Sequence, residues 1–482
     1  MSKTEIQIHS KTKIVATLGP ASNSEKVIKE LIEAGVSMFR LNTSHGSIEE
    51  HEATIGKIRN ASTSLKKHIP IMVDLQGPKI RVGNIKENIN IKAGQEIVLK
   101  HTAKEEKGII PVDYKGIAED VKKGDTILLD DGKVGLEVTK VKDKCVYAKV
   151  VYGTVIKPRK GINLPGSTKS LEVITERDKK FIEFAVNQNV DYVALSFIRT
   201  PDDILKAKKL LKKLGDEYMP VIAKIEKPQA VENLDEIIRV TDGVMVARGD
   251  LGIEMSPQDV PIVQKRIVSL AREYKKVCIV ATQMLESMIE EPIPTRAEAS
   301  DVANAIIDGT DAVMLSAETA AGKHPIEAVK IMQLIAKKTE ENGLVQTDIK
   351  SEITDFYEEM SQAIANGAIR MAEDMRATAI LSFSHSGYTP KLLSKLKPSI
   401  PVVCVSDSPQ TARRLNLFWD IYPYVADCDS VVDRNMLLRI DKILKEKAGF
   451  NNDDKIVLIG SIPKLITGRT NFIRVHKIGS IK

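Results

Sequence analysis

Two acidic residues stand where a metal site would need them. Glu226 and Asp250 each come directly after a short run of β-branched and apolar residues. Mg²⁺ takes one or two carboxylates and leaves its other positions to water and substrate oxygens. The pair therefore predicts a seat for a divalent cation. The alternative is that both acids are structural and are neutralised by Lys224 and Arg248.

Basic residues at similar positions predict an anionic substrate. Arg40 ends one apolar run, and Lys224 lies two residues before Glu226. Arginine grips phosphate or carboxylate with two hydrogen bonds, whereas lysine acts as a point charge or a proton donor. His45 is a further candidate contact, with an ordinary surface-loop histidine as the equal alternative. No GxxxxGK[ST] occurs, nor a GxGxxG after a strand, which disfavours a P-loop and a Rossmann dinucleotide site.

Small residues flank the second acid, in Gly249-Asp-Leu-Gly252. Gly249 lets the backbone come close to a ligand, and a helix start nearby offers N–H groups to a phosphate or a carboxylate. Turns use such a sequence freely as well. Its place directly after a strand, one strand after Glu226, favours the binding interpretation.

The elements that must position these residues alternate between strands and helices, which predicts β/α units and a parallel sheet. The predicted strands are 13–18, 39–44, 69–74, 190–198, 220–226, 243–247, 277–282 and 311–316. With their helices they extend over about 260 residues, the size of a closed (β/α)₈ (TIM) barrel. An open doubly wound sheet is the alternative.

Barrel enzymes carry their catalytic groups at the carboxyl ends of the strands. Seven of the eight predicted strands end in polar residues: Arg40, Asn42 and Ser44; Asp74; Ser196; Lys224 and Glu226; Arg248 and Asp250; Thr282 and Gln283; Ser316 and Glu318. Charged groups avoid burial unless they are paired, so packing alone does not account for this pattern. The strand ends therefore predict an active site.

Two further regions lie outside the barrel pattern, an insertion after its third strand and a C-terminal unit. Residues 77–160 alternate like strands, with Asp131-Gly132 as a turn, and predict a small all-β lid domain inserted after the third strand. Strand patterns at 379–383, 402–405, 455–459 and 472–475 predict a C-terminal open α/β domain. The expected domains are thus a barrel of residues 1–76 and 161–345, a lid of 77–160 and a C-terminal domain of 346–482.

A loop in the C-terminal unit is rich in hydroxyl groups. Ser382-Phe-Ser-His-Ser-Gly-Tyr-Thr389 follows a predicted strand and precedes a helix. Hydroxyls and a glycine at a helix start can cradle a phosphate. The candidate effector ligands are Ser384, Ser386, Gly387 and Thr389. The alternative is an ordinary loop in which Thr389 caps a helix with Pro390 at its first position.

Composition limits the remaining classes of protein. The 482 residues exceed one ordinary core, and 71 basic against 65 acidic residues give a scattered charge of +6, which offers little to nucleic acid. The cysteines are far apart, which fits a reduced compartment and neither disulfides nor zinc: Cys145, Cys278, Cys404 and Cys428. The polar N-terminus and the lack of any apolar run near ~20 residues predict a cytoplasmic protein without membrane association.

Longer strings in the sequence resemble pyruvate kinases. These strings are Thr17-Leu-Gly-Pro-Ala-Ser22, Phe39-Arg-Leu-Asn-Thr-Ser-His-Gly46, Asp74-Leu-Gln-Gly-Pro-Lys-Ile-Arg81, Lys224-Ile-Glu226, Val246-Ala-Arg-Gly-Asp-Leu-Gly252, Ala281-Thr-Gln-Met-Leu-Glu-Ser287, Pro294-Thr-Arg-Ala-Glu298, Asp301-Val-Ala-Asn304 and Met314-Leu-Ser-Ala-Glu-Thr319. They run nearly end to end in the order of that family. The family's plan is also a barrel, an inserted β lid and a C-terminal α/β domain.

The resemblance implies transfer of phosphate from phosphoenolpyruvate to ADP, giving pyruvate and ATP in the last step of glycolysis. Such transfer depends on positioning and charge neutralisation. Glu226 and Asp250 would hold Mg²⁺ (or Mn²⁺) between the substrate carboxylate and the enol oxygen. Arg40 and Lys224 would neutralise the migrating group, and Lys224 would also stabilise the developing enolate.

The resemblance assigns the other ligands as well. Backbone N–H groups of Gly249 and Asp250 and the hydroxyl of Thr282 would seat the substrate carboxylate. Thr282, through a water linked to Ser316, would help to deliver a proton to enolpyruvate. The residues that would face the nucleotide phosphates are Asn42, His45, Arg81 and Lys160.

This chain departs from members of the family that require potassium. Those members hold K⁺ with an Asn, a Ser and an Asp-Thr pair, and Asn42, Ser44 and Asp74 remain here while Leu75 replaces the threonine. The K⁺ site is therefore expected to be vestigial or weak. Lys79 stands where those members have an acid, and its ammonium group would supply the same positive charge. We therefore expect activity without K⁺.

The resemblance also bears on regulation, assembly and the competing hypotheses. Tyr388 stands where a basic or small residue is common, which favours a sugar monophosphate or a nucleotide monophosphate over a bisphosphate as effector. Family habit favours a homotetramer. A metal-dependent aldolase acting on pyruvate would explain the two acids but not the β insertion, and an inactive or RNA-associated scaffold would not need the strand-end residues.

Overall fold

The computed structural model describes residues 9–102, 106, 108–165, 171–345, 355–426, 434–461 and 470–481. Cys428 lies outside these ranges. The chain divides into two compact units. The first contains Met1–Val73, Asn187–Tyr192 and Val268–Lys482, and the second contains Asp74–Val186 and Val193–Ile267.

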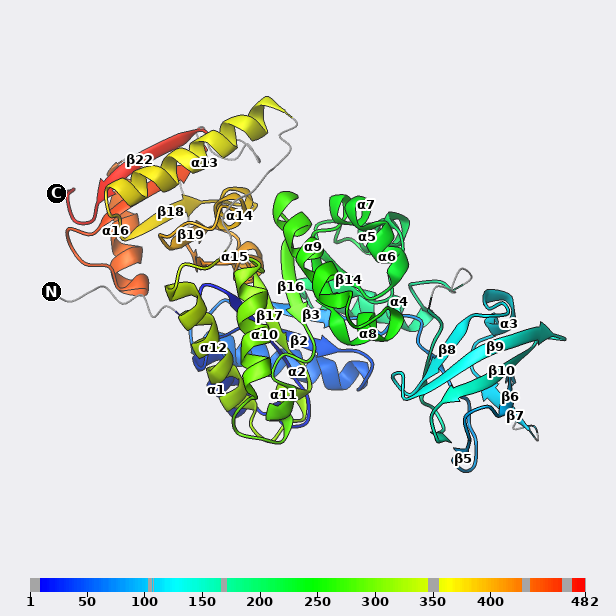
Figure 1. Ribbon diagram of the computed structural model, residues 1–482. Helices are drawn as coiled ribbons and strands as arrows, with labels where there is room; N and C mark the ends of the chain where they lie inside the picture. The colour runs from blue at the N-terminus through cyan, green and yellow to red at the C-terminus, as the bar shows by residue number, and fades with distance from the viewer. Residues whose placement is uncertain are drawn as a thin grey trace. The chain divides into compact units, whose positions relative to one another are not determined.

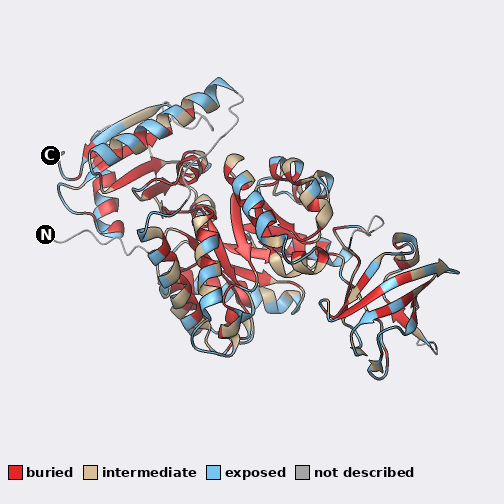
Figure 2. Cartoon of the chain, viewed as in Figure 1, coloured by how far each residue is buried: buried red, intermediate tan, exposed pale blue. Residues whose placement is uncertain are grey.

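Eight parallel strands form a closed barrel in the order β1-β17-β16-β15-β14-β13-β3-β2. They are β1 (Lys13–Thr17), β2 (Val36–Asn42), β3 (Ile71–Asp74), β13 (Tyr192–Leu195), β14 (Val221–Ile225), β15 (Gly243–Ala247), β16 (Val277–Ala281) and β17 (Ala312–Leu315). The closure confirms the predicted barrel and excludes the open sheet. Figure 2 shows that these strands are buried, as expected where helices cover a parallel sheet.

Long helices follow the strands and present apolar stripes to them. They are α1 (Glu25–Glu33), α2 (Ile48–Ser64), α4 (Glu176–Asn187), α5 (Pro201–Lys213), α7 (Leu234–Val240), α9 (Val260–Glu273), α10 (Arg296–Ile307) and α12 (Pro325–Glu341). Side chains close in sequence fix where these helices begin. Ser24 caps α1, and Ser47 and Glu50 form a capping box at the start of α2. The pair Ser256-Pro257 predicts a helix start from its sequence, and this prediction is wrong, because α9 begins at Val260.

Short helices come directly after four of the strand ends, where they fix the site residues. They are α6 (Pro228–Glu232), α8 (Arg248–Glu254) and α11 (Ala317–Ala320), together with the 3₁₀ turn η1 (Glu286–Ile289). The segment Gly249–Gly252 lies within α8. The predicted helix start beside Asp250 is therefore α8 itself.

The predicted all-β lid lies in the second unit and contains a seven-stranded sheet in the order β4-β12-β8-β9-β10-β6-β7 and a two-stranded sheet of β5 and β11. The elements are β4 (Ile80–Arg81), β5 (Ile89–Asn90), β6 (Glu96–His101), β7 (Ile109–Val112), α3 (Ile117–Asp120), β8 (Thr126–Leu129), β9 (Val134–Lys142), β10 (Cys145–Tyr152), β11 (Val155–Ile156) and β12 (Gly161–Asn163). Asp131 and Gly132 have φ of 55° and 83° in the turn between β8 and β9. The sheets close on their own apolar core, as a separate domain requires.

A five-stranded sheet in the order β20-β19-β18-β21-β22 forms the C-terminal part of the first unit. Its elements are α13 (Phe356–Asp374), β18 (Ala379–Phe383), α14 (Tyr388–Lys395), β19 (Val402–Ser406), α15 (Pro409–Leu415), β20 (Ile421–Val425), α16 (Arg434–Ala448), β21 (Lys455–Gly460) and β22 (Phe472–Lys477). Helices α13 and α16 cover opposite faces (Figure 1). The sequence did not predict β20, whose Pro423 is tolerated because β20 is an edge strand.

The described cysteines are free thiols, with Cys278 and Cys404 buried and Cys145 partly exposed. Within the described ranges, no helix combines the length and the apolar character that a membrane span requires.

Candidate active site

A buried lysine organises the strand ends of the second unit. Lys224, in β14, lies with its Nζ 2.9 Å from Glu226 Oε1 and 3.2 Å from Asp74 Oδ1. The same nitrogen donates to Ser196 Oγ at 2.6 Å, and that hydroxyl donates to the carbonyl of Leu75 at 2.7 Å. Three neighbouring strands thus contribute to one cluster. The pairing of Lys224 with Glu226, which belonged to the alternative interpretation of the two acids, occurs in a cluster that joins them to residues of two further strand ends.

The two acids of the predicted metal seat influence one another. Glu226 is fully buried, and the N–H of Phe197 donates to its Oε2 at 2.7 Å. The pKa of Glu226 is raised to about 7. Burial is the main cause, the charge of Lys224 opposes the rise, and the charge of Asp250 adds to it. Asp250 sits in the first turn of α8 and is partly exposed. A divalent cation bound by both carboxylates would relieve their repulsion, so the donor set fits Mg²⁺.

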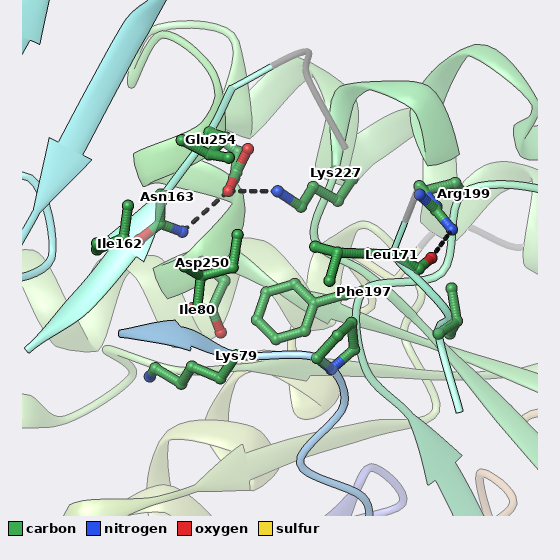
Figure 3. Close-up of a pocket in the computed structure, with 13 residues that line it drawn as sticks. Lys79, Ile80, Ile162, Asn163, Leu171, Phe197, Arg199, Lys227, Asp250 and Glu254 are labelled. Carbon is green, nitrogen blue, oxygen red and sulfur yellow. Dashed lines mark hydrogen bonds and ion pairs between the residues drawn. The ribbon is translucent and has the colours of Figure 1, made fainter. Parts of the chain in front are cut away.

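Asp250 also borders a hollow of the second unit. Figure 3 shows it beside Lys79 and Phe197, with Glu254 one helical turn further along α8. Phe197 has φ of 56°, a left-handed conformation that is unusual for an aromatic residue. Such strain persists only where surrounding contacts over-determine it, and here the backbone N–H of Phe197 is held on Glu226.

In the first unit, a pocket of about 760 Å³ gathers five predicted site residues. They are Arg40, Asn42, His45, Thr282 and Ser316. The guanidinium of Arg40 donates to Thr17 Oγ1 at 3.1 Å, and Thr17 donates to the carbonyl of Leu315 at 2.9 Å. Strands β1, β2 and β17 therefore fix the direction of Arg40. The pocket is open and is lined by the positively charged guanidinium of Arg40, so it can receive an anionic ligand.

Two hydroxyl groups line this pocket from neighbouring strands. Thr282 has φ of 68°, and its Oγ1 donates to the carbonyl of Ala281 at 2.6 Å. The Oγ of Ser316 is buried and has no hydrogen-bond partner among the described residues, while its N–H donates to Glu318 at 2.7 Å. Thr282 thus has a strained backbone and Ser316 an unpartnered buried hydroxyl, two features that packing alone does not explain.

The predicted nucleotide residues divide between the two units. Asn42 and His45 line the pocket of the first unit, where Asn42 Oδ1 accepts from the N–H of Ser44 at 3.1 Å. Arg81 and Lys160 belong to the second unit. Arg81 donates to the carbonyl of Arg159 at 3.2 Å, and Lys160 pairs with Asp130 at 2.9 Å.

The structure also places the residues at which this chain differs from family members that require K⁺. Leu75 is buried and its carbonyl accepts from Ser196, while Asp74 has Lys224 as a cationic partner. Lys79 is exposed, and its Cε comes within 3.4 Å of where a Cβ on Gly161 would lie. The ammonium of Lys224 thus brings a positive charge to Asp74 at 3.2 Å.

In the C-terminal loop, Gly387 is the N-cap of α14, with φ of 83°, and its N–H donates to Ser384 Oγ at 2.9 Å. The hydroxyl of Thr389 is buried and bonds that of Thr470 at 2.7 Å, so Thr389 does not cap the helix as the alternative required. Ser386 is exposed. Glycine serves as the cap because a left-handed backbone costs it least.

The structure shows two contacts around the predicted site residues that sequence reasoning did not find. Thr17 ends β1 and holds Arg40, so its polar strand end was a signal that could have found it. Glu254 accepts from Lys227 at 2.7 Å and from Asn163 at 2.9 Å. No local pattern marks that contact, since its three members are far apart in the chain.

Comparison with known proteins gives a consistent result. A model of the pyruvate kinase barrel domain matches residues 9–329, and one of the pyruvate kinase alpha/beta domain matches residues 362–476. A pyruvate kinase of Thermotoga maritima is 44% identical over 475 residues, 97% of this chain and 99% of that protein. One of Geobacillus stearothermophilus is 40% identical, covering 98% of this chain and 81% of its own. The crystal structure of a pyruvate kinase from Cryptosporidium parvum has a TM-score of 0.90 and 30% identity, with 99% and 98% of the chains covered.

A closed barrel with a buried lysine and carboxylates at its strand ends, an inserted β domain and a C-terminal α/β sheet defines a barrel phosphotransferase. The chain belongs to the pyruvate kinase family. This membership replaces the aldolase and scaffold interpretations.

Proposed function

We propose that this protein transfers the phosphoryl group of phosphoenolpyruvate to ADP, giving pyruvate and ATP. The observation that carries the proposal is the buried Lys224, held between Asp74 and Glu226 one strand from Asp250. A fixed cation at this position stabilises charge that develops on the enolate oxygen as the phosphoryl group departs. Arg40, directed by Thr17, neutralises phosphoryl oxygens.

Glu226 and Asp250 are the proposed ligands of the divalent cation, Mg²⁺ or Mn²⁺. When bound, the cation would supply positive charge that offsets the charge of the substrate oxygens. The N–H groups of Gly249 and Asp250, in the first turn of α8, and the hydroxyl of Thr282 orient that carboxylate. Thr282 and Ser316, both lining one pocket, hold the water that gives its proton to the enolpyruvate carbon.

The nucleotide phosphates are assigned to Asn42, His45, Arg81 and Lys160. Asn42 and His45 line an open pocket, which supports a ligand there. Lys160 directly precedes β12, so movement of the lid would carry its charge with it. Lid closure would then exclude water from the transfer.

A coupled assay with phosphoenolpyruvate, ADP and Mg²⁺ tests the reaction. We expect Lys224→Met to lower kcat/KM by about 10²–10³, because one preorganised group at the developing charge is worth that much. Lys208→Met is the matched control, since Lys208 pairs with Asp242 on the surface. A parent protein without pyruvate formation, or a Lys224→Met variant as active as the control, would reject the proposal.

We further propose that turnover does not require K⁺. The support is that Leu75 offers no hydroxyl ligand, that lysine stands at position 79, and that Lys224 brings its positive charge within 3.2 Å of Asp74. Replacing K⁺ with tetramethylammonium should change kcat less than about threefold, whereas a lost cation beside a phosphoryl group would cost far more. A large loss of turnover on removing K⁺ would contradict this part. The parent protein would then already depend on K⁺, so Lys79→Glu should create no new K⁺ dependence.

Regulation, assembly and location complete the proposal. A sugar monophosphate or a nucleotide monophosphate would bind the loop of Ser384, Ser386, Gly387 and Thr389, whose glycine cap and hydroxyls suit a phosphate. The protein would act in the cytoplasm as a homotetramer. Saturation curves for phosphoenolpyruvate with glucose 6-phosphate, ribose 5-phosphate or AMP test the effector, and no shift with any of them rejects it.

A further inference from the structure

Three segments of the second unit converge on one buried carboxylate. Glu254 ends α8, and its side chain is fully buried. Its Oε1 receives the ammonium of Lys227 at 2.7 Å and the amide of Asn163 at 2.9 Å. Figure 3 shows Glu254 between these two partners, with Asp250 on the same helix. Its Oε2 is buried and has no hydrogen-bond partner among the described residues.

Each partner comes from an element that the proposed reaction uses. Lys227 directly follows Glu226 and is the N-cap residue of α6. Its ammonium also lies 5.8 Å from the ring centre of Phe197, whose N–H holds Glu226. A displacement of Lys227 would therefore reach one proposed metal ligand both through the chain and through Phe197.

The same carboxylate lies on the helix that carries the second proposed metal ligand. Asp250 lies four residues before Glu254 on α8, and residues four apart share a helix face. Gly249 and Gly252 make this short helix weak by propensity, so tertiary contacts must hold it. Strand β15 anchors its start, and Glu254 anchors its end.

Asn163 brings the lid into this network. It is the last residue of β12, which pairs with β4 and β8 of the lid sheet. Lys160, a proposed nucleotide ligand, directly precedes the same strand. A shift of β12 on nucleotide binding would therefore change the contact at Glu254.

We propose that Glu254 is a positioning residue that couples lid strand β12 to the metal seat of Glu226 and Asp250. This inference rests on the proposed function, because that function assigns the metal seat. The network predicts that Asn163, which is not a proposed ligand, influences the affinity for the cation.

The test measures Mn²⁺ affinity by electron paramagnetic resonance, without substrates, in Asn163→Ala, Glu254→Gln and the double variant. Asn163→Ala leaves the ion pair of Lys227 in place, so it should fold even if Glu254→Gln does not. We expect it to weaken Mn²⁺ binding by at most about tenfold, the lower end of the effect of losing a partner bonded directly to a metal ligand, because Asn163 acts through Glu254. The double variant should bind no more weakly than Glu254→Gln, because both changes break one network.

Asn84→Ala is the matched control, since Asn84 is a lid asparagine whose side chain accepts from Arg159 on the surface. Equal Mn²⁺ affinity in Asn163→Ala and Asn84→Ala would overturn the inference, and so would additive effects in the double variant. Pyruvate formation by the parent protein is a separate readout. A parent that binds Mn²⁺ without forming pyruvate would reject the proposed function and leave this coupling testable.

Discussion

Individual residues near the proposed chemistry adopt backbone conformations that cost free energy. Phe197, Thr282 and Gln283 all have φ between 50° and 70°. A β-branched residue such as Thr282 pays most for this conformation. The cost is of order 1–3 kcal/mol for each such residue, and it is tolerated where geometry serves function. At Thr282, therefore, the backbone conformation costs folding free energy, while the side chain is proposed to support the reaction.

Substituting Thr282 should move stability and activity in opposite directions. We expect Thr282→Gly to keep or raise the free energy of unfolding, because glycine adopts positive φ freely. Its kcat should fall by about 10² or more, since the hydroxyl is lost, while Thr282→Ser should retain most activity. Thermal unfolding and steady-state kinetics measure both. The control Thr63→Gly, in the last turn of α2, should lose about 0.3 kcal/mol, the difference between the helix propensities of threonine and glycine, and a fully active Thr282→Gly would contradict the assignment.

Among the elements, the start of β17 and the end of α14 are joined by buried charges. Lys395, the last residue of α14, pairs with Asp311 directly before β17. Lys397 lies 3.8 Å from the same carboxylate and donates to the carbonyl of Thr310 at 3.1 Å. Burial lowers the pKa of Lys397 to about 7, with Asp311 opposing and Lys395 and Arg272 adding to the shift. Trp419 and Glu340 also face it.

This cluster predicts how stability depends on pH. From about pH 7 to about pH 10.5, the unfolded chain binds a proton at Lys397 that the folded chain has released, so stability rises with pH across this window. The slope is at most about 1.4 kcal/mol per pH unit for one group. Lys397→Met should therefore be more stable than the parent at pH 7 and should show a shallower rise. Denaturant unfolding at pH 7 to 9.5 measures the slope.

Lys338→Met provides the control, because Lys338 is exposed on α12. It should keep the slope of the parent protein. An unchanged slope in Lys397→Met would show that Lys397 is protonated in the folded protein at these pH values. The remaining pair of Lys395 and Asp311 keeps the junction closed in either case.

At the scale of the first unit, α14 extends from the proposed effector loop to the segment directly before β17, the strand that leads to the proposed active-site residue Ser316. It begins after Gly387 and ends at Lys395, which contacts Asp311. Strand β17 follows Asp311 and leads to Ser316 in the proposed active site. A ligand that shifts the start of α14 would thus act on an element with direct contact to β17.

We therefore expect Lys395→Met to abolish the effector response. The shift of the phosphoenolpyruvate saturation curve caused by glucose 6-phosphate, ribose 5-phosphate or AMP should disappear, although the probe still binds. Binding is measured by calorimetry, and the curve by the coupled assay. Lys455→Met, on the surface of the same sheet, should keep the full shift. An intact shift in Lys395→Met would contradict this route.

Much of the architecture could be predicted from the sequence because it depends on local rules. Apolar runs and their flanking polar residues located all eight barrel strands, and serine and threonine caps located helix starts. The failures are local as well. Pro423 hid edge strand β20, and Ser256-Pro257 imitated a helix start that lies at Val260. Edge position and tertiary packing decide such cases, and neither is visible in a short window.

For the site, the residue types at strand ends were determined by the sequence itself, Glu226 and Asp250 foremost. Their partners were decided by the tertiary structure alone. Lys224 bonds Asp74 and Ser196 as well as Glu226, and Glu254 joins Lys227 to Asn163, because strand order brings distant segments together. A buried charge needs a partner, but only the fold determines which residue lies within reach to provide it.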